Sequence, residues 1–266
     1  MHRRLTFALL FLLCIVSGWA GAQSRPQRAD LGGEARSFLW VGNSFFYYNN
    51  SMHGHVAAIG RGLNPPVALR GVSLTISGSG IDWHDVRSYL RPDLIGRYSF
   101  VGDNQIAFNK SGRQFDGVIM MDCSQCPIHP QLKSVFAEQM KKQSQTIVSY
   151  GARPVFFMSW AYKDKPEMTA QLAEAYTSAG NANDALVIPA GLAFANAMAK
   201  RPDLELYQPD KRHPSLAGTY LAACTVFAAL TKRSPAGSSY NAGLDRDLAG
   251  FLQATAWETV QAYYGR

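Results

Sequence analysis

The feature that most constrains the fold is a series of short segments with unbroken apolar centres, spaced between helical patterns. "SFLWVG" at 37–42 and "FDGVIMMD" at 115–122 are two of them. Strands of this kind are buried on both faces, which is typical of a parallel sheet covered by helices on each side. The complete set of predicted strands is 37–42, 67–77, 115–122, 153–162 and 185–191.

Helical patterns separate these strands. The predicted helices are 51–63, 134–151, 165–180, 191–203, 214–232 and 244–265, with a helical or irregular stretch at 82–96. Strand–helix alternation with right-handed crossovers predicts a three-layer α/β/α sandwich around a central, mostly parallel five-stranded sheet. In such a sheet the working site lies beyond the carboxyl ends of the strands. Residues that directly follow strands are therefore the first candidates for chemistry.

The beginning of the chain predicts a targeting segment. Arg3 and Arg4 precede the apolar run "LTFALLFLLCIVSGWA", and Ala20-Gly21-Ala22 has the small-x-small pattern of a signal peptidase site. The run is too short and wrongly flanked for a stable membrane anchor. We therefore expect residues 1–22 to be a cleaved signal peptide. The mature protein would be periplasmic or secreted, without stable membrane insertion.

The mature chain is expected to hold a flexible N-terminal segment at 23–36 and a single domain at 37–266, a length that one core can serve. The net charge is +7, but basic residues are spread out, with no runs longer than pairs such as Lys141-Lys142. Surfaces that bind nucleic acids are denser in charge than this. The sequence therefore predicts no nucleic-acid partner.

Two stretches carry candidate catalytic residues. Ser44 directly follows the first strand, and "FFYYNN" delays the next helix, so we expect Ser44 to open a loop. Asp210 and His213 lie three residues apart before a helix, where Pro214 suits the first turn. Histidine is the usual general base for a serine hydroxyl, and a carboxylate can orient it. Asp210 could equally be a local turn or capping residue.

Taken together, "VGNS" and "DKRHP" resemble the first and last blocks of the SGNH (GDSL-type) hydrolases, in a poorly characterised exported bacterial branch. These are serine esterases on a flavodoxin-like three-layer fold. The resemblance implies Ser44 as nucleophile, His213 as base and Asp210 as its partner, with no metal and no organic cofactor. The first block departs from the common form at Asn43, where Asp is usual.

The same resemblance implies an oxyanion hole. Its donors would be the N–H groups of Ser44 and Gly78, because glycine lets the backbone approach a substrate closely. The third donor is expected to be the amide of Gln125. Gly80 and Ser124 are the alternatives to Gly78 and Gln125.

The substrate is expected to be a small-molecule or saccharide ester. Asn43, Phe45, Trp83 and Trp160 are candidates for substrate contact, because aromatic rings beside a hydrolytic serine can stack on sugars or line an acyl pocket. These aromatic residues are also ordinary core residues, so both interpretations stay open.

Two other functions remain possible. Cys123 and Cys126 form a C-x-x-C after a predicted strand, which could be a thiol-disulfide redox pair, a structural disulfide or two inert thiols. A non-catalytic ligand-binding protein could use the same fold. His53 and His55 are two residues apart, so on a helix their rings point apart, and no metal site is expected there.

Overall fold

The computed structural model describes residues 24–92, 98–108 and 113–266. A five-stranded sheet forms its centre, with strand order β2-β1-β5-β6-β7 and every neighbouring pair parallel. The five strands are β1 (Ser37–Gly42), β2 (Arg70–Thr75), β5 (Gly117–Met120), β6 (Arg153–Phe157) and β7 (Leu186–Ile188). The parallel five-stranded sheet expected from the apolar segments is confirmed.

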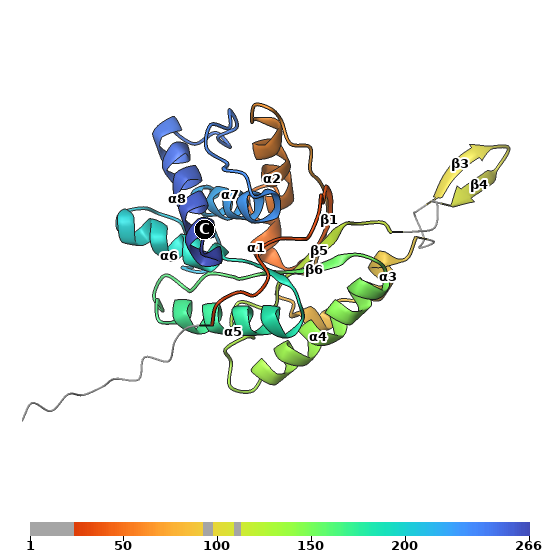
Figure 1. Ribbon diagram of the computed structural model, residues 1–266, viewed down its shortest axis with the longest axis horizontal. Helices are drawn as coiled ribbons and strands as arrows, with labels where there is room; N and C mark the ends of the chain where they lie inside the picture. The colour runs from red at the N-terminus through yellow and green to blue at the C-terminus, as the bar shows by residue number, and fades with distance from the viewer. Residues whose placement is uncertain (1–23, 93–97, 109–112) are drawn as a thin grey trace, which may run out of the picture.

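Helices cover both faces of this sheet, as Figure 1 shows. The longer helices are α2 (Met52–Arg61), α4 (Lys133–Ser149), α5 (Met168–Ala182), α6 (Ala190–Lys200), α7 (Leu216–Thr231) and α8 (Arg246–Tyr264). One core lies between the sheet and α2, α6, α7 and α8, and a second lies between the sheet and the α4–α5 side. The three-layer sandwich is thus confirmed.

Alternation along β1 explains how one strand serves both cores. Phe38 and Trp40 belong to the core under α7, whereas Leu39 and Val41 belong to the core under α4 and α5. Successive side chains of a strand point to opposite faces, so a strand covered on both sides has apolar side chains on both faces through its centre. All six residues of β1 are buried accordingly.

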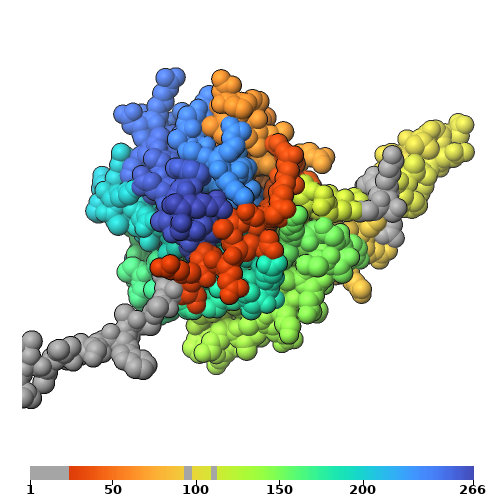
Figure 2. Space-filling view, in the orientation of Figure 1, coloured from red at the N-terminus to blue at the C-terminus, as the bar shows by residue number. Residues whose placement is uncertain are grey.

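Two elements differ from the expectation. Ser44 does not open a loop but begins the single-turn helix α1 (Ser44–Tyr47), which the Asn43 side chain caps. The helical or irregular stretch predicted at 82–96 agrees with a short helical turn η1 (Ile81–Trp83) and α3 (Val86–Leu90), although its last residues lie outside the described part. The second difference is an unpredicted antiparallel hairpin of β3 (Tyr98–Gly102) and β4 (Gln105–Phe108). The hairpin projects from the body in Figure 2.

The described part of the N-terminal segment makes hydrogen bonds to the body of the protein. The Ser24 hydroxyl donates to Glu174 on α5 at 2.7 Å, and the backbone N–H of Gln27 donates to Asn181 at 2.8 Å. Residues 1–22, where the signal peptide is predicted, lie outside the described residues. In the described part of the chain, every helix falls short of the length and apolarity that a membrane span requires.

Candidate active site

Ser44 is the first residue of α1, two residues after the end of β1, at the carboxyl edge of the sheet. Asn43 caps this turn, because its side-chain oxygen accepts from the Phe45 N–H at 3.2 Å. The Ser44 side chain is largely buried, and its Oγ lies 2.9 Å from Nε2 of His213. Ser44 is the first residue of the helix, so its own N–H has no partner within the helix and is available to a ligand.

His213 is held in the loop before α7 by Asp210. One carboxylate oxygen of Asp210 accepts from the backbone N–H groups of Arg212 and His213, and the other lies 2.5 Å from Nδ1 of His213. A carboxylate only accepts hydrogen bonds, so Nδ1 carries the proton. Nε2 is then free to accept the Ser44 hydroxyl proton. The structure brings these three side chains together across 169 residues of sequence.

The charge of Asp210 is favoured by its surroundings. Partial burial opposes ionisation, but hydrogen bonds from the His213 ring and from the N–H groups of Arg212 and His213 outweigh it, and the pKa of Asp210 falls to about 2. The carboxylate is therefore ionised at neutral pH, where it can stabilise an imidazolium on His213.

Asn43 ties together the three loops that form the edge of the site. Its amide donates to the carbonyl oxygens of Ser79 at 2.9 Å and Asp122 at 3.3 Å, while its oxygen caps α1. Asn43 was a candidate for substrate contact, but its polar atoms are all used inside the protein and it is only 5% exposed. It acts on the site by holding the loop after β1 against those after β2 and β5.

Asp122 completes this connection from the β5 side. Its Oδ1 accepts from the N–H groups of Ile81 at 2.9 Å and Cys123 at 2.7 Å. Burial raises the pKa of Asp122, although these two hydrogen bonds oppose the shift. Asp122 was not among the site residues predicted from the sequence, although its position directly after a buried strand is a signal that could have identified it.

The two candidate glycines of the oxyanion hole differ in their surroundings. Gly78 is exposed in a turn after β2, with φ of +72° and open space where a Cβ would stand. Gly80 is buried, and a Cβ there would lie 2.5 Å from Oδ1 of Asp82 and 3.0 Å from Oδ1 of Asp122. Gly78 therefore presents backbone to the outside, whereas Gly80 packs inward.

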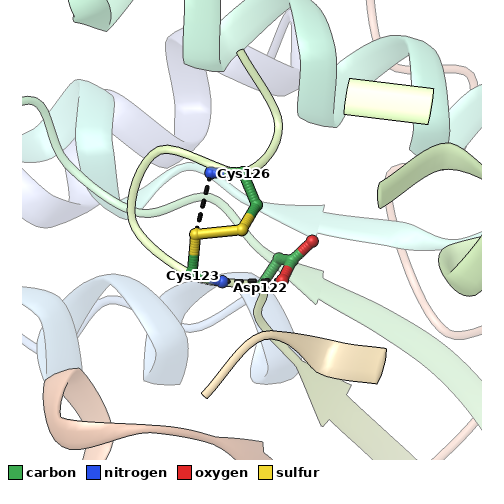
Figure 3. A group of neighbouring side chains, drawn as sticks. All are labelled: Asp122, Cys123 and Cys126. Atoms are coloured by element: carbon green, nitrogen blue, oxygen red, sulfur yellow. Dashed lines mark hydrogen bonds between the residues drawn. A yellow bond between two sulfur atoms is a disulfide. The ribbon is translucent and has the colours of Figure 1, made fainter. Parts of the chain in front are cut away.

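The loop after β5 carries Ser124 and Gln125 between two bonded cysteines. Cys123 and Cys126 form a disulfide, drawn with Asp122 in Figure 3. The disulfide excludes the interpretation as two inert thiols and leaves a redox pair and a structural disulfide as the alternatives. The Ser124 hydroxyl lies 2.7 Å from the hydroxyl of Tyr162, whereas the half-buried Gln125 side chain has no hydrogen bond to the described residues.

Metal binding has little support in this part of the molecule. Asp122, Cys123 and Cys126 are grouped closely enough to hold an ion, but the cysteine sulfurs are bonded to each other. Thiolates are the ligands that metals use, so the group as it stands does not fit one. His55, one of the two histidines of the 53–55 pair, is hydrogen-bonded to Asn49 and Tyr240.

The aromatic candidates fall into two classes. Trp160 is fully buried, stacks on Phe45 with ring centroids 4.6 Å apart, and donates its indole N–H to the Arg212 carbonyl at 2.9 Å. Phe45 in turn meets the His213 ring edge-on at 5.5 Å. These two residues support the His213 loop from inside and present little surface to a ligand. Trp83 is 61% exposed and can contact one.

Comparisons with known proteins give the fold. No family model and no curated protein sequence matches the chain. A DUF4886 family protein from Bacteroides uniformis is 20% identical, with 87% of this chain and 96% of that chain covered and a TM-score of 0.59. A Slackia heliotrinireducens protein provisionally assigned as an SGNH hydrolase is 22% identical, covering 74% of this chain and 99% of its own, with a TM-score of 0.54.

A third similar structure is a catalytic mutant of an acetylxylan esterase from Geobacillus stearothermophilus. It is 14% identical, with 75% of this chain and 95% of that chain covered and a TM-score of 0.55. The expected resemblance to the SGNH hydrolases is confirmed at the level of the fold.

Proposed function

We propose that this chain is an exported serine hydrolase that cleaves carboxylic esters through an acyl-enzyme on Ser44. The observation that carries the proposal is the hydrogen-bonded series Ser44–His213–Asp210, at 2.9 and 2.5 Å, at the carboxyl edge of a parallel sheet. Each member has a role: a nucleophile, a base within reach of its proton, and a carboxylate that orients the base.

The reaction runs in two halves. His213 takes the Ser44 proton through Nε2 while Oγ attacks the acyl carbonyl carbon, and it then gives that proton to the departing alkoxide. Water then gives a proton to Nε2 of His213 as its oxygen attacks the acyl carbonyl carbon. The bond between that carbon and Ser44 Oγ breaks, His213 returns the proton to Oγ, and the acid leaves. Asp210 remains ionised throughout and stabilises the imidazolium.

The oxyanion is received by backbone N–H groups of Ser44 and Gly78, with the Gln125 amide as third donor. Gln125 is preferred to Ser124 because the Ser124 hydroxyl already has Tyr162 as partner. Removal of one donor costs about 3 kcal/mol of barrier. No organic cofactor has a role in this scheme.

The substrate class that we propose is a small-molecule ester, in particular an acyl group on a carbohydrate. Two exposed aromatic rings favour it. Tyr47 lies in α1 with Ser44 and donates its hydroxyl to Ser77 at 3.0 Å, and Trp83 follows the Gly78 loop in the chain. Exposed aromatic rings stack on sugar faces. The fold shared with an acetylxylan esterase adds support.

The deciding experiment measures p-nitrophenyl acetate and acetylated oligosaccharide hydrolysis by the purified mature protein and its Ser44→Ala variant. We expect Ser44→Ala to lose activity to background, a fall on the order of 10⁶-fold at most. Ser149→Ala, at the end of α4, is the matched control and should keep full activity. Activity retained by Ser44→Ala would refute the acyl-enzyme, and inactivity of the wild type on the whole ester panel would favour a non-catalytic binding protein.

The Cys123–Cys126 disulfide keeps thiol-disulfide exchange as a second candidate. The two functions separate in one comparison. A hydrolase loses ester cleavage with Ser44→Ala but not with the Cys123→Ser/Cys126→Ser double variant, whereas a redox protein shows dithiol oxidation that follows the cysteines alone.

Export is tested by expressing the full chain and measuring the N-terminus of the mature protein by mass spectrometry, with Gln23 as the expected first residue.

A further inference from the structure

The segment directly after α1 has an unusual backbone. Asn49, Asn50 and Ser51 have φ values of 54°, 67° and 66°, three consecutive non-glycine residues in the left-handed region. Each such residue costs roughly 1–2 kcal/mol in an L-chain, although asparagine tolerates it best. A run of this kind persists only where surrounding contacts hold it.

Asn49 makes those contacts, and they lead to the loop of His213. Its amide donates to the carbonyl oxygen of Pro214 at 3.0 Å and to the Thr219 hydroxyl at 2.8 Å. The backbone carbonyl oxygen of Asn49 accepts a hydrogen bond from Nε2 of the buried His55 at 2.6 Å. Nε2 therefore carries the proton, and Nδ1 of His55 accepts from the Tyr240 hydroxyl at 2.8 Å.

This arrangement sets Tyr48 against the catalytic base. The Tyr48 ring lies 4.3 Å from the His213 ring, centroid to centroid, at an interplanar angle of 11°. The two in-plane hydrogen bonds of His213 fix the axis through its nitrogens but leave the ring free to tilt about that axis. A ring stacked flat on the imidazole removes this freedom, and its π face favours the imidazolium that forms during proton transfer.

We propose that Tyr48 and Asn49 are positioning residues for His213: Tyr48 holds the plane of the imidazole, and Asn49 fixes Tyr48 to the loop that carries His213. The inference rests on the proposed function, because it concerns the base of that reaction. It assigns the left-handed run its purpose, which is to turn the chain after the nucleophile back onto the base.

The test compares Tyr48→Leu and Tyr48→Phe, and adds Asn49→Gly, which keeps the left-handed backbone but removes the amide. We expect Tyr48→Leu and Asn49→Gly to lower kcat by about 10- to 100-fold with KM nearly unchanged, as misplacement of a catalytic group does. Tyr48→Phe should rescue kcat to within about threefold of wild type, because the stacked ring remains. Tyr98→Leu, on the distant hairpin, is the matched control and should match wild type.

A second readout does not depend on substrate. The His213 Nδ1 proton, hydrogen-bonded to Asp210, should give a low-field proton NMR signal in the wild type and Tyr48→Phe. That signal should broaden or vanish in Tyr48→Leu and Asn49→Gly. An unchanged signal and kcat in both variants would overturn the proposal. If the wild type cleaves no ester, the proposed function is refuted, but the NMR comparison still tests the positioning role of Tyr48 and Asn49. If Tyr48→Leu does not fold, Asn49→Gly alone provides the test.

Discussion

Asp210 and His213 are hydrogen-bonded at 2.5 Å even though the Asp210 side chain is 45% exposed to solvent. The same carboxylate also accepts hydrogen bonds from the backbone N–H groups of Arg212 and His213, and these keep the contact in place. The geometry of the pair is thus built within four consecutive residues, before any distant contact contributes.

The first prediction follows from the acceptor-only character of this carboxylate. In Asp210→Asn, an amide N–H can face Nδ1 and favour the tautomer that leaves Nε2 protonated and unable to take the Ser44 proton. We expect kcat at pH 7 to fall by about 10⁴-fold, the effect of the same change in a Ser-His-Asp triad. Asp245→Asn, which alters an exposed helix cap, is the control. A fall of less than about tenfold would contradict the role of Asp210.

The second prediction concerns stability in acid. The pKa of Asp210 is about 2 in the folded protein, below the roughly 3.9 of an unfolded aspartate. Its ionised form therefore stabilises the fold above about pH 4, and this contribution is lost as the pH falls toward 2. Thermal unfolding of wild type and Asp210→Asn from pH 5 to pH 2 should show a Tm difference that shrinks over this range. A difference independent of pH would refute the coupling.

The third prediction uses the departure at Asn43. Aspartate is common at this position in the resembling family, yet here the side-chain amide donates to two buried carbonyl oxygens, of Ser79 and Asp122. Asn43→Asp replaces this double donor with an acceptor, and we expect a loss of about 3 kcal/mol in the free energy of unfolding. Urea denaturation measures it. Asn183→Asp is the control. The Asn183 side-chain amide donates a hydrogen bond to Ala179 at a helix end, where water can replace it, so the free energy of unfolding should fall much less.

The fourth prediction separates the two candidate glycines. Gly78→Ala meets open space but keeps a positive φ, so we expect a cost of about 1 kcal/mol. Gly80→Ala forces its methyl group against Asp122, whose carboxylate is held by two N–H groups, so the cost should be larger, about 2–3 kcal/mol. Urea denaturation of both variants checks the order, and a reversed order would mean that the Gly80 turn is not packed as described.

Much of the fold could be predicted from local sequence because its signals are local. Apolar runs of strand length alternate with helical patterns, and the unbroken apolar centre of a strand such as β1 predicts burial on both faces. The hairpin of β3 and β4 could not be predicted in this way. It has exposed apolar residues, Phe100 and Phe108 among them, so apolarity does not mark burial there.

The candidate site likewise has some features that follow from neighbouring residues and others that depend on distant contacts. Local sequence was enough to predict that Ser44 follows a strand and that Asp210 and His213 share a turn, because strand ends and i, i+3 spacing are properties of neighbouring residues. Three contacts could be known only from the folded chain: Nε2 of His213 lies 2.9 Å from Ser44, the Asn43 amide bonds to two neighbouring loops, and Tyr48 stacks on the base. These relationships depend on how separate loops meet at the sheet edge, and that is set by packing across the whole core.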